Sequence, residues 1–236
     1  MIFVSAIVVA AGKGKRFRSK IPKPLVKIGD LPIILYSLKA LAGLPMIKEI
    51  IVAANPENIK SITGKIRQYK IYKAKKIILG GKRRQDSVQN ALRSVDKRAN
   101  LVLIHDAARP FADRKIIGRV IKESKKCGAV VVGVPIKATI KEVHSSQFTV
   151  HSKFVVKKTI DRTNLWEIQT PQVFRKDLIL GAYKKFGHLD VTDDAMLVEK
   201  SGRRVAVVMG SYNNIKITTP EDLVLAKMIA SRLCTK

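Results

Sequence analysis

Residues 3–16 read FVSAIVVAAGKGKR, an apolar run of strand length that leads directly into a basic turn with two glycines. From Ala6 to Ala11 the run has no polar residue, which is typical of a strand buried on both faces of a parallel sheet. Glycines in the turn let backbone N–H groups approach a phosphate or a base closely, and Lys and Arg add positive charge. The segment therefore predicts a buried first strand followed by a basic glycine-containing loop, which is a candidate for anion binding.

Strand-length apolar runs and helical stretches alternate as far as Pro135. We expect strands at 3–10, 49–53, 76–79, 101–105 and 129–134, and helices at 33–42, 57–69, 85–95 and 114–126. This order predicts an α/β fold, a mostly parallel sheet with helices on both faces. Ligands of such sheets bind beyond the carboxyl ends of the strands, so functional residues are expected directly after the strands.

The alternation ends after Pro135, where residues 138–158 form two short β-like segments around the polar turn Ser145-Ser146-Gln147. They predict a hairpin that leaves the main sheet, a β-arm at about 136–158. Two strands alone cannot bury both of their faces, so we expect the arm to join two copies of the chain in a homodimer.

Beyond the arm, the sequence indicates helices at 176–185 and 193–200, strands at 205–209 and 215–217, and a last helix to about Leu233. Thr219-Pro220-Glu221-Asp222 marks the start of that helix, with Thr as the N-cap, Pro at the first position and acids in the first turn. The sequence contains no repeat and no linker, so residues 1–236 are expected to form a single domain with the arm attached.

The composition excludes several classes of protein. Apolar runs are too short to span a bilayer, and the N-terminus has no secretory signal pattern. The two cysteines, Cys127 and Cys234, lie far apart and suit a reducing compartment, so we expect a cytoplasmic protein without membrane contact. The net charge of +28 permits nucleic-acid binding, but only 6% of residues are aromatic and no nucleic-acid-binding motif is present, so we do not expect that function.

The loop from Ala10 to Lys23 differs from two common phosphate-binding loops. A Walker A loop needs Gly, four residues and Gly-Lys-Ser/Thr, and that spacing is absent. A dinucleotide fingerprint needs a third glycine where Phe17 stands, and an acid at the end of the second strand. The loop is therefore expected either to hold phosphate in another way or to be an exposed basic turn.

Two further motifs also follow predicted strands. In Gly80-Gly81-Lys82-Arg83-Arg84-Gln85-Asp86-Ser87, the glycines suit backbone contact with a nucleobase, and Ser87 either caps the next helix or binds a base edge. In His105-Asp106-Ala107-Ala108-Arg109-Pro110, Asp106 is well sited to hold Mg²⁺ and Arg109 to lie near phosphate. The alternative for the second motif is an Asp–Arg pair that braces the loop, and His105 is expected to be structural.

These motifs occur in order with Arg16, Pro22-Lys23, Asp161-Arg162, Leu165-Trp166, Gln169-Thr170-Pro171-Gln172 and Asn214-Ile215-Lys216-Ile217-Thr218. The combined pattern covers nearly the whole chain and resembles the 2-C-methyl-D-erythritol 4-phosphate cytidylyltransferase family. The resemblance implies a Rossmann-like nucleotidyltransferase fold, a homodimer joined by the β-arm, and Mg²⁺-dependent transfer of CMP from CTP to a phosphorylated polyol.

The resemblance also implies roles for individual residues. Arg16, Lys23 and Lys216 correspond to the catalytic cations, and Asp106 to the acid on the metal side. The nucleotide-binding positions are Ala10, Ala11, Gly12, Gly14, Gly81 and Ser87. The acceptor-binding positions are Arg109, Thr139, Arg162, Thr170 and Thr192. In the family, the arm carries the contacts that match Thr139 and Arg162 across the dimer to the acceptor.

Two positions depart from the family pattern. Lys82 follows the glycine pair where the family often has an acid near the cytosine, and Ala138 precedes Thr139 where the family usually has Asp. The alternatives left open are a ribitol-5-phosphate cytidylyltransferase and a sugar-phosphate nucleotidyltransferase with another base.

Overall fold

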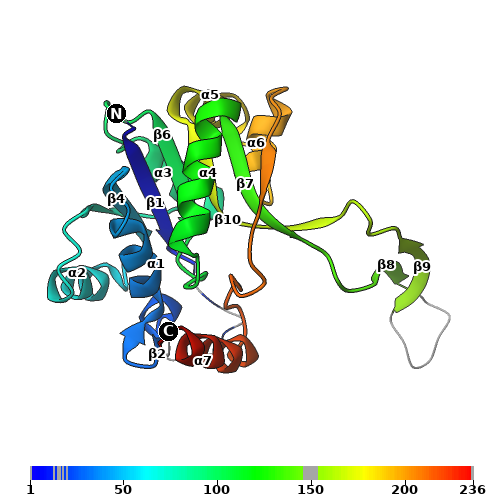
Figure 1. The fold of residues 1–236 in the computed structure, drawn as a ribbon, viewed down its shortest axis with the longest axis horizontal. Coiled ribbons are helices and arrows are strands. Elements are labelled where there is room, and N and C mark those ends of the chain that lie inside the picture. Colours follow the sequence, from blue (N-terminus) through cyan, green and yellow to red (C-terminus); the bar gives the residue numbers. More distant parts are fainter. Residues whose placement is uncertain are drawn as a thin grey trace.

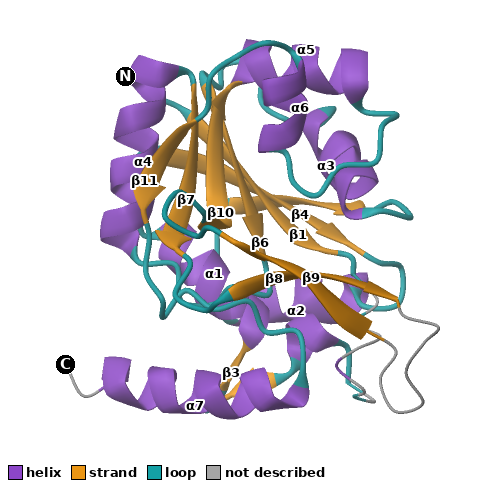
Figure 2. Ribbon diagram, turned by 90° about the vertical axis from the view of Figure 1, so that its right-hand side faces the viewer, coloured by secondary structure: helices purple, strands orange, loops and turns teal. Residues whose placement is uncertain are grey.

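A sheet of seven strands, in the order β11-β7-β10-β6-β1-β4-β5, runs through the centre of the part of the chain that the structure describes (Figures 1 and 2). The computed structural model describes residues 2–12, 14, 17, 19, 21–145 and 154–234, with side chains as far as 232. The parallel strands are β1 (Val4–Ala10), β4 (Ile47–Ala54), β5 (Ala74–Leu79), β6 (Leu101–Asp106), β7 (Ala129–Pro135) and β11 (Ala206–Met209). Strand β10 (Trp166–Arg175) runs antiparallel to its neighbours β6 and β7.

Helices cover both faces of the sheet (Figure 2). One hydrophobic cluster joins the sheet to α1 (Ile33–Ala42), α2 (Ile59–Gln68) and α4 (Arg114–Cys127), and a second joins it to α3 (Arg84–Leu92), α5 (Lys176–Phe186) and α6 (Ala195–Lys200). Alternate side chains of β1 belong to different clusters: Val8 packs in the first and Ile7 in the second, both fully buried. Each such side chain contributes roughly 1.5–3 kcal/mol through the removal of apolar surface from water, which explains the unbroken apolar run.

The observed order confirms the predicted α/β fold, but β10, the strand expected at 215–217 and the short hairpin of β2 (Lys27–Ile28) and β3 (Leu31–Pro32) differ from the expectation. The structure adds β10, because the polar residues Gln169, Thr170 and Gln172 were interpreted only as candidate site residues, although all three are buried within this strand. The expected strand at 215–217 is wrong: this segment has no ladder partner among the described residues, and Ile217 N donates to Ala108 O at 2.9 Å. It is an extended segment held by that bond and by burial of the Ile217 side chain.

The last helix, α7 (Pro220–Cys234), begins at the predicted position. The Asp222 carboxylate accepts hydrogen bonds from the backbone N–H groups of Thr218 and Thr219 at 2.7 and 2.9 Å, and Thr219 Oγ1 accepts from Asp222 N at 3.4 Å. These bonds satisfy backbone donors at the helix start. The helix packs on the short hairpin of β2 (Lys27–Ile28) and β3 (Leu31–Pro32) in a third hydrophobic cluster that includes Phe17 and Ile217.

The expected hairpin is present as β8 (Ile140–Ser145) and β9 (Phe154–Ile160), an antiparallel pair that projects away from the sheet (Figure 1). The turn predicted at 145–147 continues beyond Ser145 outside the described residues. Val143 lies opposite Val156 in the register, and both side chains are half exposed. The arm therefore presents apolar side chains that this chain leaves uncovered.

Candidate active site

A cavity of about 520 Å³ lies at the carboxyl ends of β1, β4, β5 and β6. Its described lining includes Ala10, Ala11 and Gly12 after β1, Asn55 and Pro56 after β4, Gly80 to Ser87 around the start of α3, and Asp106 to Ala108 after β6. The chain proceeds from β1 through β4 to β5 and then returns to β6 on the other side of β1. The cavity thus lies at the topological switch point, where sheets of this kind bind ligands.

The glycine turn after β5 lies directly against the loop after β1. A Cβ atom on Gly80 would lie 2.3 Å from Ala11 Cβ, and one on Gly81 would lie 2.3 Å from Asp86 Cβ. Ser87 Oγ accepts a hydrogen bond from Gly81 N at 3.0 Å and donates to Arg83 O at 3.2 Å. Only glycine fits the close approach of the two loops, and the Ser87 hydroxyl fixes the turn.

Ser87 does not cap α3. Of the two roles expected for Ser87, the role of helix cap is therefore wrong. The N-cap is Arg83, whose backbone N–H donates to Asp86 Oδ2 at 2.9 Å. Ser87 lies one residue beyond Asp86 and uses its hydroxyl to hold the turn. The other expected role, contact with a base edge, remains a prediction, and Ser87 does line the cavity.

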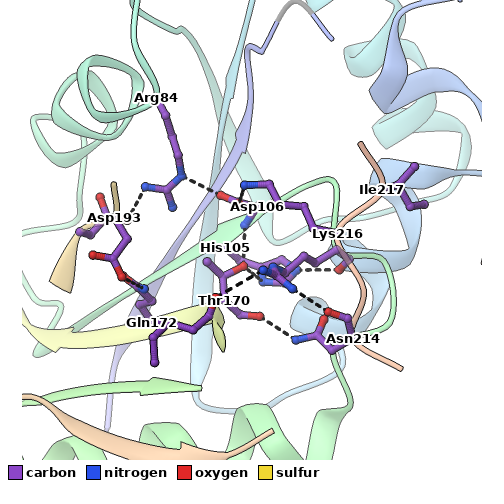
Figure 3. A network of polar contacts seen from close by, with 12 residues as sticks. Arg84, His105, Asp106, Thr170, Gln172, Asp193, Asn214, Lys216 and Ile217 are labelled. Carbon is purple, nitrogen blue, oxygen red and sulfur yellow. Dashed lines mark hydrogen bonds and ion pairs between the residues drawn. The ribbon is translucent and has the colours of Figure 1, made fainter. Parts of the chain in front are cut away.

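Cationic side chains from distant parts of the sequence line the cavity, and Figure 3 shows Arg84 and Lys216 beside Asp106. Lys23 comes from the short 3-10 turn η2 (Lys23–Leu25) and donates from Nζ to Ile217 O at 3.0 Å. Lys216 Nζ lies 2.6 Å from Asp106 Oδ2, and Arg84 Nε donates to Asp106 Oδ1 at 2.8 Å. Lys23, Lys216 and Asp106, which the sequence singled out as candidates, therefore do line one cavity.

Arg84 was quoted in the glycine motif, but sequence reasoning gave it no role. In the structure it bridges two carboxylates, since Nη1 donates to Asp194 Oδ2 at 2.8 Å while Nε donates to Asp106. Its position five residues after a strand, in the first turn of α3, was the available signal. The partnership with Asp194 spans 110 positions in the sequence and could not be predicted from local spacing.

Asp106 is ionised although its side chain is only 9% exposed. Burial opposes its ionisation, but the charges of Arg84 and Lys216 outweigh burial and hold the pKa of Asp106 well below its usual range. The carboxylate is thus a permanent negative charge in an otherwise cationic cavity.

His105 is structural, as expected. Thr170 Oγ1 accepts from Asp106 N at 3.0 Å and donates to His105 Nδ1 at 3.0 Å, so His105 Nε2–H is assigned as the donor to Arg109 O at 3.0 Å. Burial lowers the pKa of His105 to about 4, so the ring is neutral near pH 7. Thr170 therefore orients His105 and the backbone of Asp106 together.

The predicted acceptor residues are spread more widely. Arg109 and Thr170 are buried next to the cavity but are not among its lining residues, and Arg109 Nη1 donates to Asn214 O at 2.8 Å. Thr139, Arg162 and Thr192 are exposed and do not line the cavity of this chain; Arg162 donates to the Lys137 carbonyl at the base of the arm.

The nucleotide-binding positions Ala10, Ala11, Gly12, Gly81 and Ser87 line the cavity. Gly14 has a positive φ of 60° and its O accepts from Phe17 N at 2.8 Å, so the loop turns back next to Lys23. Arg16, the remaining predicted catalytic residue, lies outside the described residues.

Asp106 is the acidic side chain among the described residues that line the cavity, and the described part of the chain holds no cluster of three metal-ligating side chains. Mg²⁺ commonly takes one or two carboxylates and completes its coordination with substrate phosphates and water. The donor set therefore fits a divalent cation carried in with a triphosphate, with Asp106 as its protein ligand, and does not fit an all-protein metal site.

A switch-point cavity with glycine loops and converging cations, on a mostly parallel α/β sheet, is the architecture of a nucleotide-binding transferase. Residues 4–232 match the family described as 2-C-methyl-D-erythritol 4-phosphate cytidylyltransferase (IspD), and the chain belongs to this family.

Related proteins agree over nearly the full length. The chain is 44% identical over 227 residues to the 2-C-methyl-D-erythritol 4-phosphate cytidylyltransferase of Clostridioides difficile (strain 630), which covers 95% of this chain and 92% of the relative. The protein of that name from Caldanaerobacter subterraneus is 44% identical over 230 residues, and the match covers 95% of this chain and 97% of the relative.

Solved structures share the fold. The 4-diphosphocytidyl-2C-methyl-D-erythritol synthase of Anaerococcus prevotii is 32% identical with a TM-score of 0.82, and the match covers 98% of this chain and 97% of that one. The 2-C-methyl-D-erythritol 4-phosphate cytidylyltransferase of Thermus thermophilus is 29% identical with a TM-score of 0.76, and the match covers 98% of this chain and 100% of that one.

In the described part of our chain, no helix has the length and apolar character needed to cross a membrane.

Proposed function

We propose that this chain transfers CMP from CTP to 2-C-methyl-D-erythritol 4-phosphate and releases pyrophosphate, a step in the synthesis of isoprenoid precursors. The observation that carries the proposal is the convergence of Lys23, Lys216, Arg84 and Asp106 in the switch-point cavity of a chain that belongs to this family. An oxygen of the acceptor phosphate attacks the α-phosphorus of CTP. The new P–O bond forms as the bond to the bridging oxygen breaks, and pyrophosphate leaves with the electron pair.

The residues of the cavity suit this reaction because its main obstacle is charge repulsion. The acceptor phosphate is already an anionic nucleophile, so the transfer needs no general base. Fixed cations lower the cost of bringing two polyanions together and stabilise the charge that builds in the transition state. We assign that role to Arg16, Lys23 and Lys216.

Nucleotide binding is assigned to the two loops that meet at Ala11 and Gly80. The small residues Ala11 and Gly80 let a base and phosphates approach the backbone of both loops closely. The N–H groups of Gly80 and Gly81 already donate to Ala54 O and Ser87 Oγ, at 2.8 and 3.0 Å, so these two donors fix the turn. Lys82 lines the cavity where the family often has an acid, so discrimination of the cytosine is assigned to backbone groups of the turn.

A divalent cation, in our proposal Mg²⁺, would be held by Asp106 together with the triphosphate. When bound it supplies positive charge to the phosphate oxygens. The carboxylate of Asp106 is ready for this role because it is ionised and faces the cavity.

We propose further that the chain works as a single-domain homodimer, in the cytoplasm, with the β-arm at about 136–158 as the joining element. Val143, Phe154 and Val156 are exposed by 50%, 63% and 53%, and a ribbon of two strands needs apolar cover to be stable in water. Thr139 and Arg162, near the base of the arm, then contribute to the acceptor site across the dimer, and Arg109, Thr170 and Thr192 complete it.

The decisive experiment measures pyrophosphate release for four nucleoside triphosphates against two acceptors, 2-C-methyl-D-erythritol 4-phosphate and ribitol 5-phosphate. We expect release with CTP and the methylerythritol acceptor. Release with ribitol 5-phosphate alone would instead identify the acceptor of the related ribitol-5-phosphate enzymes, and release with a different base would refute CTP as the donor.

A further inference from the structure

A continuous polar chain runs from the hydrophobic core behind the sheet to the cavity, through Tyr183, Asp194, Arg84, Asp106 and Lys216. Tyr183 Oη donates to Asp194 Oδ1 at 2.5 Å, and Arg84 Nη1 donates to Asp194 Oδ2 at 2.8 Å. Arg84 Nε then donates to one oxygen of Asp106, and Lys216 lies 2.6 Å from the other (Figure 3). The transfer reaction assigned above gives no role to Tyr183 or Asp194, and it uses Arg84 only as one of the charges that line the cavity.

The two ends of this polar chain differ in exposure, because Tyr183 and Asp194 are buried and Lys216 is partly exposed. Asp194 is fully buried, the Arg84 side chain is 26% exposed and the Lys216 side chain is 40% exposed. Burial opposes the charge of Arg84, but the charges of Asp194 and Asp106 outweigh it and raise the pKa of Arg84. Burial and the charge of Asp194 raise the pKa of Tyr183, which therefore stays a donor. The inner end is a fixed support, and Lys216 is the end that is able to move.

Arg84 and Lys216 share one carboxylate, so either cation can leave without exposing an unpaired buried charge at Asp106. Arg84 is anchored on both sides, by Asp194 and Asp106, and its planar guanidinium keeps one geometry. Lys216 has a flexible stem, and the phosphates of a bound triphosphate offer it more negative charge than the shared carboxylate does. Removal of one partner from a buried pair is otherwise strongly unfavourable.

We propose that Tyr183 and Asp194 are positioning residues that hold Arg84 against Asp106, so that Asp106 keeps one cation and its place when Lys216 turns to the substrate phosphates. This inference rests on the proposed function. Without Asp194, Arg84 loses one of its two anchors and holds Asp106 less firmly. Asp106 then depends on Lys216 for its positive partner. Lys216 therefore stays at Asp106, although the reaction needs it at the substrate phosphates.

The test measures kcat and KM for CTP by pyrophosphate release. Asp194→Asn is expected to lower kcat about 10–100-fold, the range for loss of a residue that orients a group at the reacting centre. KM for CTP changes by less than about threefold, because ground-state contacts with the nucleotide are kept. Asp194→Glu keeps the charge and is expected to recover part of kcat, and Tyr183→Phe to lower kcat less than Asp194→Asn.

A second background separates positioning from stability. Because Asp194 acts through Arg84, Asp194→Asn should lower kcat little further in an Arg84→Met enzyme, whereas an independent structural role predicts the same factor in both backgrounds. Asp177→Asn on α5 and Tyr72→Phe are matched controls, since both side chains are exposed and lie outside the polar chain, and both should keep wild-type kcat.

The outcomes distinguish the two proposals. The positioning role would be overturned if Asp194→Asn lowered kcat by the same factor in both backgrounds, or did not lower it at all. In either case, pyrophosphate release by the unmodified enzyme would still uphold the transferase function. Should Asp194→Asn fail to fold, Tyr183→Phe carries the same comparison. A wild-type enzyme that releases no pyrophosphate with any acceptor would overturn the proposed function and this inference with it.

Discussion

Lys23 and Ile217 are joined by a hydrogen bond of 3.0 Å from Nζ to the backbone carbonyl, although 194 positions separate them in the sequence. Ile217 is fully buried in the cluster under α7, and its neighbour Lys216 faces the cavity. One bond thus fixes the amino-terminal loop relative to the carboxyl-terminal segment. Ile217 packs against α7 in the core, and it also bonds to Lys23 and directly follows Lys216. Burial of Ile217 therefore places the two proposed catalytic cations, Lys23 and Lys216, in the same cavity.

Loss of either loop cation should impair transfer. Lys23→Ala and Arg16→Ala are each expected to lower kcat at least about 10²-fold, the effect of removing one preorganised charge stabiliser. Pyrophosphate release under saturating CTP measures the change. Lys27→Ala, four residues on and exposed, is the control and should retain wild-type kcat. Undiminished turnover in both loop variants would refute their assignment.

The contact between the two nucleotide loops should depend on glycine. Gly80→Ala places a Cβ 2.3 Å from Ala11 Cβ, so we expect the unfolding free energy to fall by about 1–3 kcal/mol and CTP binding to weaken. Urea unfolding and calorimetric CTP titration measure the two effects. A Cβ on Gly64 in α2 meets nothing within 4 Å, so Gly64→Ala should stabilise by about 0.5–1 kcal/mol. If Gly80→Ala matched the stability of Gly64→Ala, the loops would not be in close contact.

Acid should destabilise the fold through His105. Burial lowers the pKa of His105 to about 4 from 6.5, so the unfolded chain binds the extra proton between these values. Above about pH 6.5 the ring is neutral in both states, and its contribution to the unfolding free energy has its full value. As pH decreases towards 4, protonation favours the unfolded chain, and the unfolding free energy falls by up to about 1.4 kcal/mol per pH unit. Urea unfolding of wild type and His105→Gln at pH 7 and pH 5 tests this, and the variant should show the smaller pH dependence.

The ring of His105 offers a direct check of the same prediction. Its NMR resonances, assigned by their absence in His105→Gln, should stay constant between pH 7 and pH 5 because the ring remains neutral. A titration centred within that interval would contradict the buried, hydrogen-bonded ring.

The β-arm should control the oligomeric state. Val156→Asp places a charge on the apolar face of the arm, where the Val156 side chain is 53% exposed, and should shift a dimer towards monomer in sedimentation velocity. Activity should fall with dissociation if Thr139 and Arg162 act across the dimer. Tyr72→Asp, at a side chain that is 80% exposed and far from the arm in sequence, is the control. A wild-type monomer at micromolar concentration would refute the role of the arm.

Much of the fold was determined by local sequence. The first helix was predicted at its observed bounds, and the start of α7 follows from Thr219 and Pro220. Strand β10 was missed because Gln169, Thr170 and Gln172 are polar yet buried, where hydrogen bonds with distant partners satisfy them: Asn214 Nδ2 donates to Gln169 Oε1 and to Thr170 O, and Gln172 Nε2 donates to Asp193 Oδ2. A period-two apolar pattern cannot identify such a strand.

By itself, the sequence determined the parallel sheet, the glycine loops after its strands and the candidate cations, because burial and turn geometry act over a few residues. Only the tertiary structure decided which charges meet. Arg84 in α3 reaches Asp106 and Asp194 across 22 and 110 positions, and Asp106 at the end of β6 pairs with Lys216 in the extended segment at 215–217. Charge pairs of this kind depend on distances of a few ångströms between side chains, which are set by the packing of the whole core.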